Sequence, residues 1–545
     1  MKNLLLLLLS LLAIACTSQS SDEAENQYDI VIYGGTSGGI AAAIQAARLG
    51  KSVVLIEPTD RLGGLTTGGL GQTDIGNKQA IGGISREFYQ NIRDYYNDPQ
   101  HWKWQKQESY LDGGQTRTTE NEDAMWTFEP SAALKVYEDM LTAEAIEVII
   151  GERLNRETGV NKVDNRISEI SLENGTTYAG KMFIDATYEG DLMAAAGVDY
   201  IVGRESNEEY GETYNGVQLL EGHQFPDGVD PYTIPGDPES GLLWGISPTS
   251  LDEQGSGDSL VQAYNFRICL TNAEENKVPI TRPENYDSTR YELLARLFDA
   301  QPEMSAINQY FIWSHMPNAK TDINNRGGFS TDMINWSHAY PEASYAERAE
   351  IIKAHEDYTK GLLYFYSTDT RVPKVLQEEI QHWGYPKDEY TQHGNWSPQL
   401  YVREARRLIG ALVMTQAHCQ GKETAEDPIG LAAYTMDSHN CQRIVVDGQV
   451  KNEGNVEVGG FPPYPIAYRS ITPKQSQATN LLVPVCLSAS HISFGSIRME
   501  PVFMVLGQSA ATAATLAIDA DQSVQSIDYA QLREKLLSDG QILEN

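Results

Sequence analysis

The chain has 545 residues, of which 41% are hydrophobic and 21% are charged, so it can bury a large core and form two or more domains. Its formal net charge of −34 argues against binding to nucleic acid and against docking on an anionic membrane surface, because both would repel it. Small neutral or cationic molecules are therefore the expected partners.

The N-terminus has the composition of an export signal. An apolar run, Leu4–Ala15, follows a single lysine and turns polar directly after Cys16. The run is too short to span a bilayer comfortably, and the small residue before Cys16 resembles a bacterial lipoprotein processing box. We expect a signal over 1–16, a lipid-anchored Cys16 and a tether over 17–26. The protein would then face the periplasm or the cell surface and touch a membrane only through the anchor; a cleaved signal and a secreted protein are the alternative.

A βαβ pattern follows the tether. The apolar run Tyr28–Tyr33 has the length of a strand, Ile40–Lys51 is alanine-rich with helical spacing, and a second apolar strand ends in Glu57. The glycine turn between the first strand and the helix suits a diphosphate at the helix N-terminus, while Glu57 can accept hydrogen bonds from a ribose. This context predicts a dinucleotide-binding unit, with a plain strand-to-helix turn as the alternative.

The glycine turn departs from the usual fingerprint at one position. Gly34 takes the first glycine position and Gly39 the third, but Thr36 stands in the middle one, where a missing side chain normally lets the diphosphate approach. Gly35 and Gly38 beside it can supply the room, and the hydroxyl of Thr36 can donate to a phosphate oxygen. Ser37 is also expected at this site. We therefore expect the change to be tolerated.

A glycine-dense stretch, Leu62–Gly69, comes soon after Glu57. Its glycines would let a loop lie against a flat ligand with its main-chain amides exposed, and a flexible loop is the alternative. Further along, Asn165–Gly197 is predicted to form a hairpin, a buried strand and a helix.

The C-terminal third holds a second strong pattern. Residues 480–519 read as a buried strand, a small-residue loop that carries His491 and Arg498, and a long helix from about Pro501. Amides at the N-terminus of that helix would favour a group that becomes anionic.

These segments resemble the two-dinucleotide-binding-domain flavoproteins. Together with WTFEP at Trp126–Pro130, YNFRICLT at Tyr264–Thr271 and FPPYPIAYRSITPK, they are similar to a bacterial family of mostly exported FAD-dependent oxidoreductases, over roughly residues 27 to 520. The resemblance implies bound FAD. The residues expected at the FAD site are Gly34, Gly35, Thr36, Ser37, Gly39, Glu57, Gly63, Gly64, Thr66, Thr67, Asp185, Thr187, Asp191, Arg498, Pro501 and Gln508.

The expected fold is α/β, with a discontinuous Rossmann-like FAD-binding domain and an inserted α+β substrate domain. The FAD-binding domain would comprise 27–90, 125–200 and 475–530, and the insertion 201–474. Within the insertion we expect a loop at 225–241, helical tracts near 285–300 and 341–365, and an amphipathic helix over 400–416.

Histidine suits a base that removes a hydroxyl proton near neutral pH. His491 is the first candidate because it precedes the ligand-facing helix, and a structural role is its alternative. His439 is the second, with Asn440 as a companion, against the alternative of a core histidine. Arg498 could hold the carbonyl edge of the flavin or a substrate carboxylate, and Arg469 could lie on the substrate side. No metal-ligand spacing is present, so we predict no metal site.

The remaining cysteines form no CxxC pair, so redox chemistry would depend on the cofactor. No second dinucleotide fingerprint is visible, so electrons would pass from substrate to flavin and on to oxygen or a separate acceptor. The leading hypothesis is an oxidase or dehydrogenase for a hydroxyl-bearing small molecule, with a sugar or glycan-derived substrate favoured by the many aromatic residues. A flavin-containing lyase or isomerase acting on glycans, and a non-catalytic surface glycan-binding protein, are the alternatives.

Overall fold

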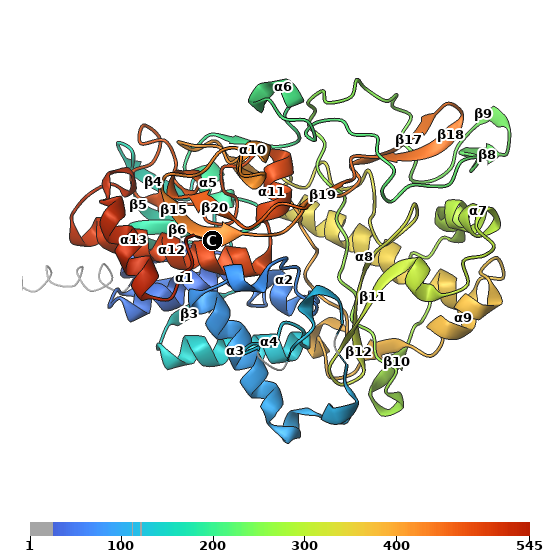
Figure 1. Cartoon of the computed structure of the whole chain (residues 1–545), viewed down its shortest axis with the longest axis horizontal. Coiled ribbons are helices and arrows are strands. Elements are labelled where there is room, and N and C mark those ends of the chain that lie inside the picture. The colour runs from blue at the N-terminus through green and yellow to red at the C-terminus, as the bar shows by residue number, and fades with distance from the viewer. Residues whose placement is uncertain (1–25, 112, 120–121, 545) are drawn as a thin grey trace, which may run out of the picture.

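The computed structural model describes residues 26–544 except 112, 120 and 121. The predicted signal and lipid-anchored Cys16 lie outside the described residues. Two parts are visible in Figure 1, one around a sheet with long helices and one with α7, α8, α9 and several hairpins. Each part has its own hydrophobic core.

The first part is organised around one sheet. Its strand order is β3-β2-β1-β6-β5-β4, and β21 also pairs with β6. β1 runs parallel to both β2 and β6, while β5 and β4 are antiparallel additions. The α/β class with a parallel, Rossmann-like sheet is confirmed. The strands are β1 (Gln27–Tyr33), β2 (Val53–Glu57), β3 (Glu147–Ile150), β4 (Val160–Val163), β5 (Arg166–Ser171), β6 (Thr177–Asp185) and β21 (Leu481–Leu482).

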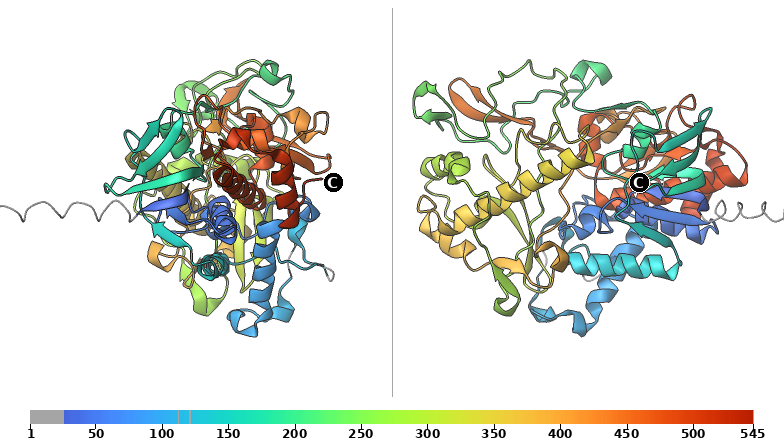
Figure 2. Two further views of the ribbon diagram at one scale, coloured as in Figure 1. Left: turned by 90° about the vertical axis from the view of Figure 1, so that its left-hand side faces the viewer. Right: turned by 180° about the vertical axis from the view of Figure 1, so that it is seen from behind.

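Two helices, α1 (Ser37–Arg48) and α12 (Glu500–Asp519), pack closely against each other and the sheet (Figure 2). They touch where Gly507 meets Gly38, since a Cβ on Gly507 would lie 2.0 Å from the Gly38 oxygen. Among the described helices, α12 alone is long and apolar enough to cross a membrane, and here it is buried within the protein. The other helices of this part are α2 (Gly64–Thr67), α3 (Gly83–Asn97), α4 (Pro130–Ala143), α5 (Asp191–Ala195), α11 (His491–Ile497) and α13 (Tyr529–Ser538).

The remaining elements are short strand pairs and helices; most lie in the second part, but those between residues 414 and 436 and between 456 and 471 contribute to the core of the first. α7 (Glu292–Ala300) and α8 (Tyr345–Thr368) confirm the two helical tracts predicted near these positions. The other helices are α6 (Asn207–Tyr210), α9 (Lys374–Ile380) and α10 (Gln416–Cys419). The strands pair as β7 (Tyr200–Ile201) with β14 (Arg407–Leu408), β8 (Tyr232–Ile234) with β9 (Asp237–Leu242), β10 (Lys277–Pro279) with β13 (Gly384–Pro386), β11 (Phe311–Met316) with β12 (Lys320–Asn325), β15 (Pro428–Ala432) with β20 (Tyr464–Ala467), β16 (Met436–Ser438) with β19 (Val456–Val458), and β17 (Gln442–Val446) with β18 (Gln449–Glu453).

The amphipathic helix predicted over 400–416 is wrong. This stretch is mostly irregular and carries only β14 and the start of α10. Arg403, Arg406 and Arg407 are all buried, each paired with a carboxylate from a distant segment. These ion pairs to distant carboxylates form from irregular chain, so tertiary contacts override the helical spacing.

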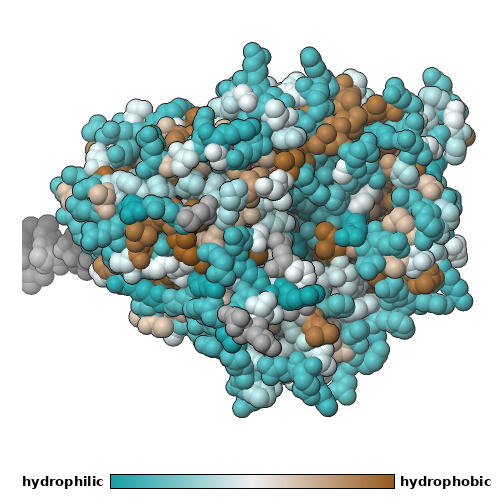
Figure 3. Space-filling model, viewed as in Figure 1, coloured by the Kyte–Doolittle hydropathy of each residue, from teal (hydrophilic) through white to brown (hydrophobic). Residues whose placement is uncertain are grey.

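Two predicted loops are also structured. Residues 225–241 contain the β8–β9 hairpin, closed by Pro235 and Gly236, whose φ of +79° favours glycine. The segment that begins at His491 is the short helix α11, which Ser490 caps by accepting a hydrogen bond from the Ser493 N–H. The face of the molecule in Figure 3 is largely hydrophilic, in keeping with the strong net charge.

Candidate functional site

The candidate ligand cleft lies where the parallel strands end. β1 leads at Tyr33 into the glycine turn and α1, with β2 on one side and β6 on the other. The chain continues from β1 into α1, on one face of the sheet, and from β6 into α5, on the other. Ligands of such sheets bind in the crevice between two connections that diverge in this way.

The glycine turn has the close contacts that a dinucleotide turn requires. Gly34 has a φ of +107°, and a Cβ on Gly39 would lie 1.8 Å from the Gly34 oxygen. Thr36 caps α1, because its hydroxyl accepts from the Gly39 N–H and donates to the Ala186 oxygen over 2.7 Å. That hydroxyl proton is therefore committed to the protein, so Thr36 stabilises the turn here and does not point its proton at the cleft.

The start of α1 presents free main-chain donors. Within the described part of the chain, the N–H groups of Ser37 and Gly38 have no hydrogen-bond acceptor. Free N–H groups and the positive end of the helix dipole together favour an anionic ligand such as a phosphate.

Glu57, at the end of β2, closes one end of the cleft. Its carboxylate accepts from the Gly35 N–H over 2.6 Å and from the Thr59 N–H over 2.7 Å. Burial raises the pKa of Glu57 to about 7, although these hydrogen bonds oppose the rise. A cavity of about 70 Å³ lies beside it, lined from both parts of the chain by residues that include Gly34, Thr36, Gly64, Thr187, Tyr340 and Gln399.

The glycine-dense stretch folds into the short helix α2. Gly63 and Gly64 both have positive φ, and a Cβ on Gly64 would lie 2.3 Å from the Tyr188 hydroxyl. Thr67 donates to the Leu62 oxygen and so stabilises the turn, whereas Thr66 points its hydroxyl toward α12. The loop thus brings Gly64 and Thr66 to the cleft.

Glu500, the first residue of α12, is a site residue that sequence reasoning missed, although it directly precedes the predicted Pro501. Its carboxylate is buried and accepts hydrogen bonds from Ser37 (2.5 Å), Thr66 (2.8 Å) and Tyr188 (2.7 Å). Burial raises the pKa of Glu500 against these three hydrogen bonds. Pro501 lies in the same first turn, so four expected cofactor segments meet at this carboxylate.

Asp185 and Asp191 serve the turn after β6. Asp185 accepts hydrogen bonds from Thr187 and from the Met193 N–H, and burial raises the pKa of Asp185 to about 6. Asp191 begins α5 and pairs with Arg348 over 2.6 Å; burial would raise the pKa of Asp191, but the arginines around it lower the value. Thr187 lines the cavity, and the ion pair between Asp191 and Arg348 joins the two parts of the chain.

Gln508 lies away from the cleft. Its side-chain oxygen accepts from the Ile84 N–H and from Gln541, each over 2.9 Å, at the start of α3. Arg469 is also remote from the cleft, since it pairs with Asp427 and remains 44% exposed. Gln508 therefore joins α12 to α3 and to Gln541, and Arg469 forms an ion pair at the surface.

A second group of polar side chains lies beyond the glycine-dense stretch Leu62–Gly69, which we call the glycine loop. Tyr401 packs on Leu65 of that loop and on the leucine directly after it, and accepts a hydrogen bond from Arg498 over 2.7 Å. Arg498 also reaches Asp437 over 3.2 Å. The loop therefore connects the dinucleotide cleft to this group.

His439 lies at the centre of the second group. Its Nδ1 is 2.9 Å from Asp332 and its Nε2 is 3.6 Å from Asp437. Burial would raise the pKa of both carboxyls, but His439 and the neighbouring Arg403 and Arg498 hold these pKa values below their usual range. The side chains of His439 and Asp437 keep 10% and 17% exposure, so this pair is largely buried but retains a small opening to solvent.

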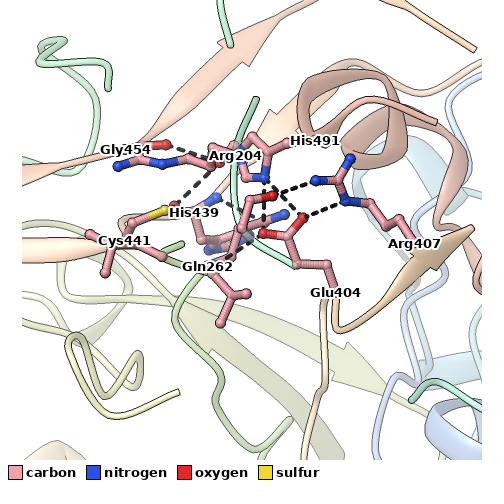
Figure 4. Close-up of polar contacts among 12 residues, drawn as sticks. Arg204, Gln262, Glu404, Arg407, His439, Cys441, Gly454 and His491 are labelled. Atoms are coloured by element: carbon pink, nitrogen blue, oxygen red, sulfur yellow. Dashed lines mark hydrogen bonds and ion pairs between the residues drawn. The ribbon is translucent and has the colours of Figure 1, made fainter. Parts of the chain in front are cut away.

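His491 is more deeply buried, and Figure 4 shows its contact with Glu404. Its Nδ1 is 2.9 Å from the Glu404 carboxylate, its Nε2 is 2.8 Å from the Ser438 hydroxyl, and only 2% of the residue is exposed. Both ring nitrogens are engaged within the protein, so His491 has none available to a ligand in this arrangement. The two predicted catalytic histidines therefore have different surroundings, and only His439 reaches solvent.

Most partners of His439 could not be recognised from the sequence. Asp332, Arg403 and Asp437 carry no motif, and Arg403 falls within the stretch predicted as a helix. The one available signal was the run REARR, because three arginines in five residues need carboxylate partners wherever the fold buries them.

The family model described as "FAD dependent oxidoreductase" matches residues 29–536 of the chain. No curated protein matches. Similar solved structures include a flavin-containing monooxygenase from Stenotrophomonas maltophilia (15% identity, 36% of this chain and 45% of that chain, TM-score 0.20). Others are Thermovibrio ammonificans THI4 (17%, 33% and 67%, 0.23) and T. acidophilum thioredoxin reductase (18%, 30% and 35%, 0.17). The chain spans less than half the length of the monooxygenase, and the family match carries the assignment.

Proposed function

Because the chain belongs to the FAD dependent oxidoreductase family, we propose that it oxidises a hydroxyl-bearing small molecule, with a sugar or glycan-derived compound as the leading substrate class. His439, held between Asp332 and Asp437 beside the glycine loop, is the observation that carries the proposal. Electrons would leave for oxygen or a separate acceptor.

The residues of the cleft fit FAD. The glycine turn admits a diphosphate where side chains would clash, the N–H groups of Ser37 and Gly38 are free, and Glu57 offers a carboxylate to a ribose. When bound, FAD supplies the hydride acceptor. Tyr340 and Gln399 from the second part of the chain line the same cavity and would cover the cofactor.

Proton removal is the role we assign to His439. Asp332, 2.9 Å from Nδ1, orients the ring and leaves Nε2 for the substrate hydroxyl. Asp437, 3.6 Å from Nε2, can accept a second hydroxyl of the same molecule. His491 is assigned a positioning role, because it ties Glu404 to Ser438, the residue directly before His439.

An anaerobic substrate screen tests this proposal. The FAD-loaded protein, lacking its first 25 residues, would be mixed with a panel of sugars, polyols and simple alcohols. Loss of the flavin absorbance at about 450 nm reports hydride transfer. Bleaching by a hydroxyl compound, slowed in His439→Gln, supports the proposal; a panel that leaves the flavin oxidised overturns it.

Export and lipid anchoring through Cys16 belong to the same proposal. An exported enzyme would meet glycans more readily than reduced nicotinamide, in line with the single dinucleotide fingerprint of the sequence.

A further inference from the structure

Several buried N–H groups near His439 have no acceptor among the residues that the structure describes. They are Nε and Nη2 of Arg403, Nε of Arg498, Nε2 of Gln262 and Nδ2 of Asn440. All four residues are at most 3% exposed. Leaving a buried donor unpaired costs free energy, and native proteins seldom do so without a ligand or water. These donors therefore point to a bound group.

The four side chains form one connected set. The Gln262 side-chain oxygen accepts a hydrogen bond from the main-chain N–H of His439 over 3.0 Å and another from Arg498 over 3.4 Å. The guanidinium carbons of Arg403 and Arg498 lie 4.7 and 5.6 Å from the centre of the same Tyr401 ring. The segment that carries Gln262 pairs with the one that carries Asn440, because the Ala263 N–H donates to the Asn440 oxygen over 3.0 Å.

The charges of this set are already balanced. Arg403 pairs with Asp332 over 3.0 Å and Arg498 pairs with Asp437 over 3.2 Å. Two guanidinium groups thus face two carboxylates, and no positive charge remains to attract an anion. The free donors are suited to oxygen atoms without formal charge.

Acceptors lie next to the free donors. Asp437 contacts both Arg498 and His439, and the side chains of Asp437 and His439 are partly exposed. A hydroxyl group donates one hydrogen bond and accepts others, so a molecule with neighbouring hydroxyls can satisfy both kinds of group at once. A carboxylate could accept from the free donors but would be repelled by Asp437.

We propose that Gln262, Arg403, Asn440 and Arg498 bind the hydroxyl oxygens of an uncharged sugar or polyol and discriminate against acidic sugars. This assignment names the substrate class of the proposed function and rests on it. The same donors could instead serve the carbonyl oxygens of the flavin, and binding measurements on amide-to-acid variants separate the two sources.

Gln262→Glu is the sharpest variant. Glutamate keeps the oxygen that serves His439 and Arg498 and replaces only the unpaired N–H group by an acceptor. Asn440→Asp makes the same exchange at the second amide. Asn272→Asp, at an exposed position, adds the same charge elsewhere and is the matched control. Thermal unfolding of each variant checks that it folds.

Binding is measured by anaerobic flavin difference spectra and by thermal shift. The probes are two matched pairs, D-glucose with D-glucuronate and D-galactose with D-galacturonate. We expect saturable binding of a neutral sugar, at least tenfold weaker binding of its acid, and a tenfold or greater loss of neutral-sugar affinity in Gln262→Glu but not in Asn272→Asp.

Each contrary result has its own meaning. Tighter binding of the acids, no binding of any probe, or equal affinity in wild type and Gln262→Glu overturns the inference. A sugar-free spectrum or FAD affinity that changes in Gln262→Glu assigns the donors to the flavin and also overturns it. Binding needs no turnover, so a neutral sugar that binds without bleaching the flavin would contradict the proposed oxidation while leaving this inference intact.

Discussion

The carboxylate of Glu500 lies 2.5 Å from the hydroxyl of Ser37. Ser37 begins α1 and Glu500 begins α12, so the N-termini of two long helices meet at one buried carboxylate. Among the described residues no cation pairs with it, and the positive ends of two helix dipoles account for its tolerance there.

Glu500→Gln is expected to change how stability depends on pH. The pKa of Glu500 is raised above its ordinary value of 4.5 in the folded protein, which therefore holds a proton that the unfolded chain has lost. The free energy of unfolding should fall as pH rises above 4.5, and the variant should lack this part of the fall. Urea unfolding of the cofactor-free protein at pH 5 and pH 8 checks it. Identical pH dependence in both proteins would contradict the assignment.

Glu57→Gln is expected to weaken FAD binding about tenfold to a hundredfold, because it removes a charged acceptor from the ribose position. Ribose hydroxyls favour the ionised carboxylate, whose pKa is about 7 in the cofactor-free protein. FAD affinity of the wild type should therefore increase as pH rises from 6 to 8, and that of the variant should not. Quenching of FAD fluorescence gives both affinities. A variant that keeps the pH dependence would place the titrating group elsewhere.

The two histidines should separate in their effects. His439→Gln is expected to slow flavin reduction by roughly a hundredfold or more and to lower the melting temperature less than His491→Ala does, because glutamine can still donate to Asp332 and Arg403 remains paired with it. His491→Ala would leave Glu404 buried beside an emptied position, and should cost about 3 kcal/mol or more in the free energy of unfolding. Stopped-flow reduction and urea unfolding measure the two effects. The reverse pattern would return His491 to the catalytic role.

Gly39→Ala should abolish FAD binding or folding of the cleft. The added methyl group would lie 1.8 Å from the Gly34 oxygen, a main-chain atom that cannot move without breaking the turn. Gly113→Ala is the matched control, because a methyl group added there would have nothing within 4 Å and its φ of −144° suits alanine. FAD retention after gel filtration reports the outcome, and a Gly39→Ala protein that retains FAD would refute the close-approach argument.

Cys16→Ser is expected to prevent lipid attachment. Wild-type protein expressed with its leader should incorporate labelled palmitate and sediment with membranes, and the variant should do neither. Release of both proteins into the soluble fraction would favour the cleaved-signal alternative.

The sequence by itself determined the dinucleotide unit. β1, the glycine turn, α1, β2 and Glu57 lie within about thirty consecutive residues, and their periodicity and spacing report on contacts between neighbours in the chain. The long helix at the C-terminus could be placed for the same reason, since α12 begins one residue from the predicted Pro501.

Only the tertiary structure decided which charged groups meet. Ser37 and Glu500 are 463 residues apart. His439 has Asp437 two residues before it in the chain, but Asp332, which its Nδ1 contacts, lies 107 residues away. Arg403 has helical spacing in the sequence, yet it lies in irregular chain, where it pairs with Asp332. Burying an arginine is favourable only when a carboxylate from elsewhere offsets the lost hydration, and that partner is chosen by the fold as a whole.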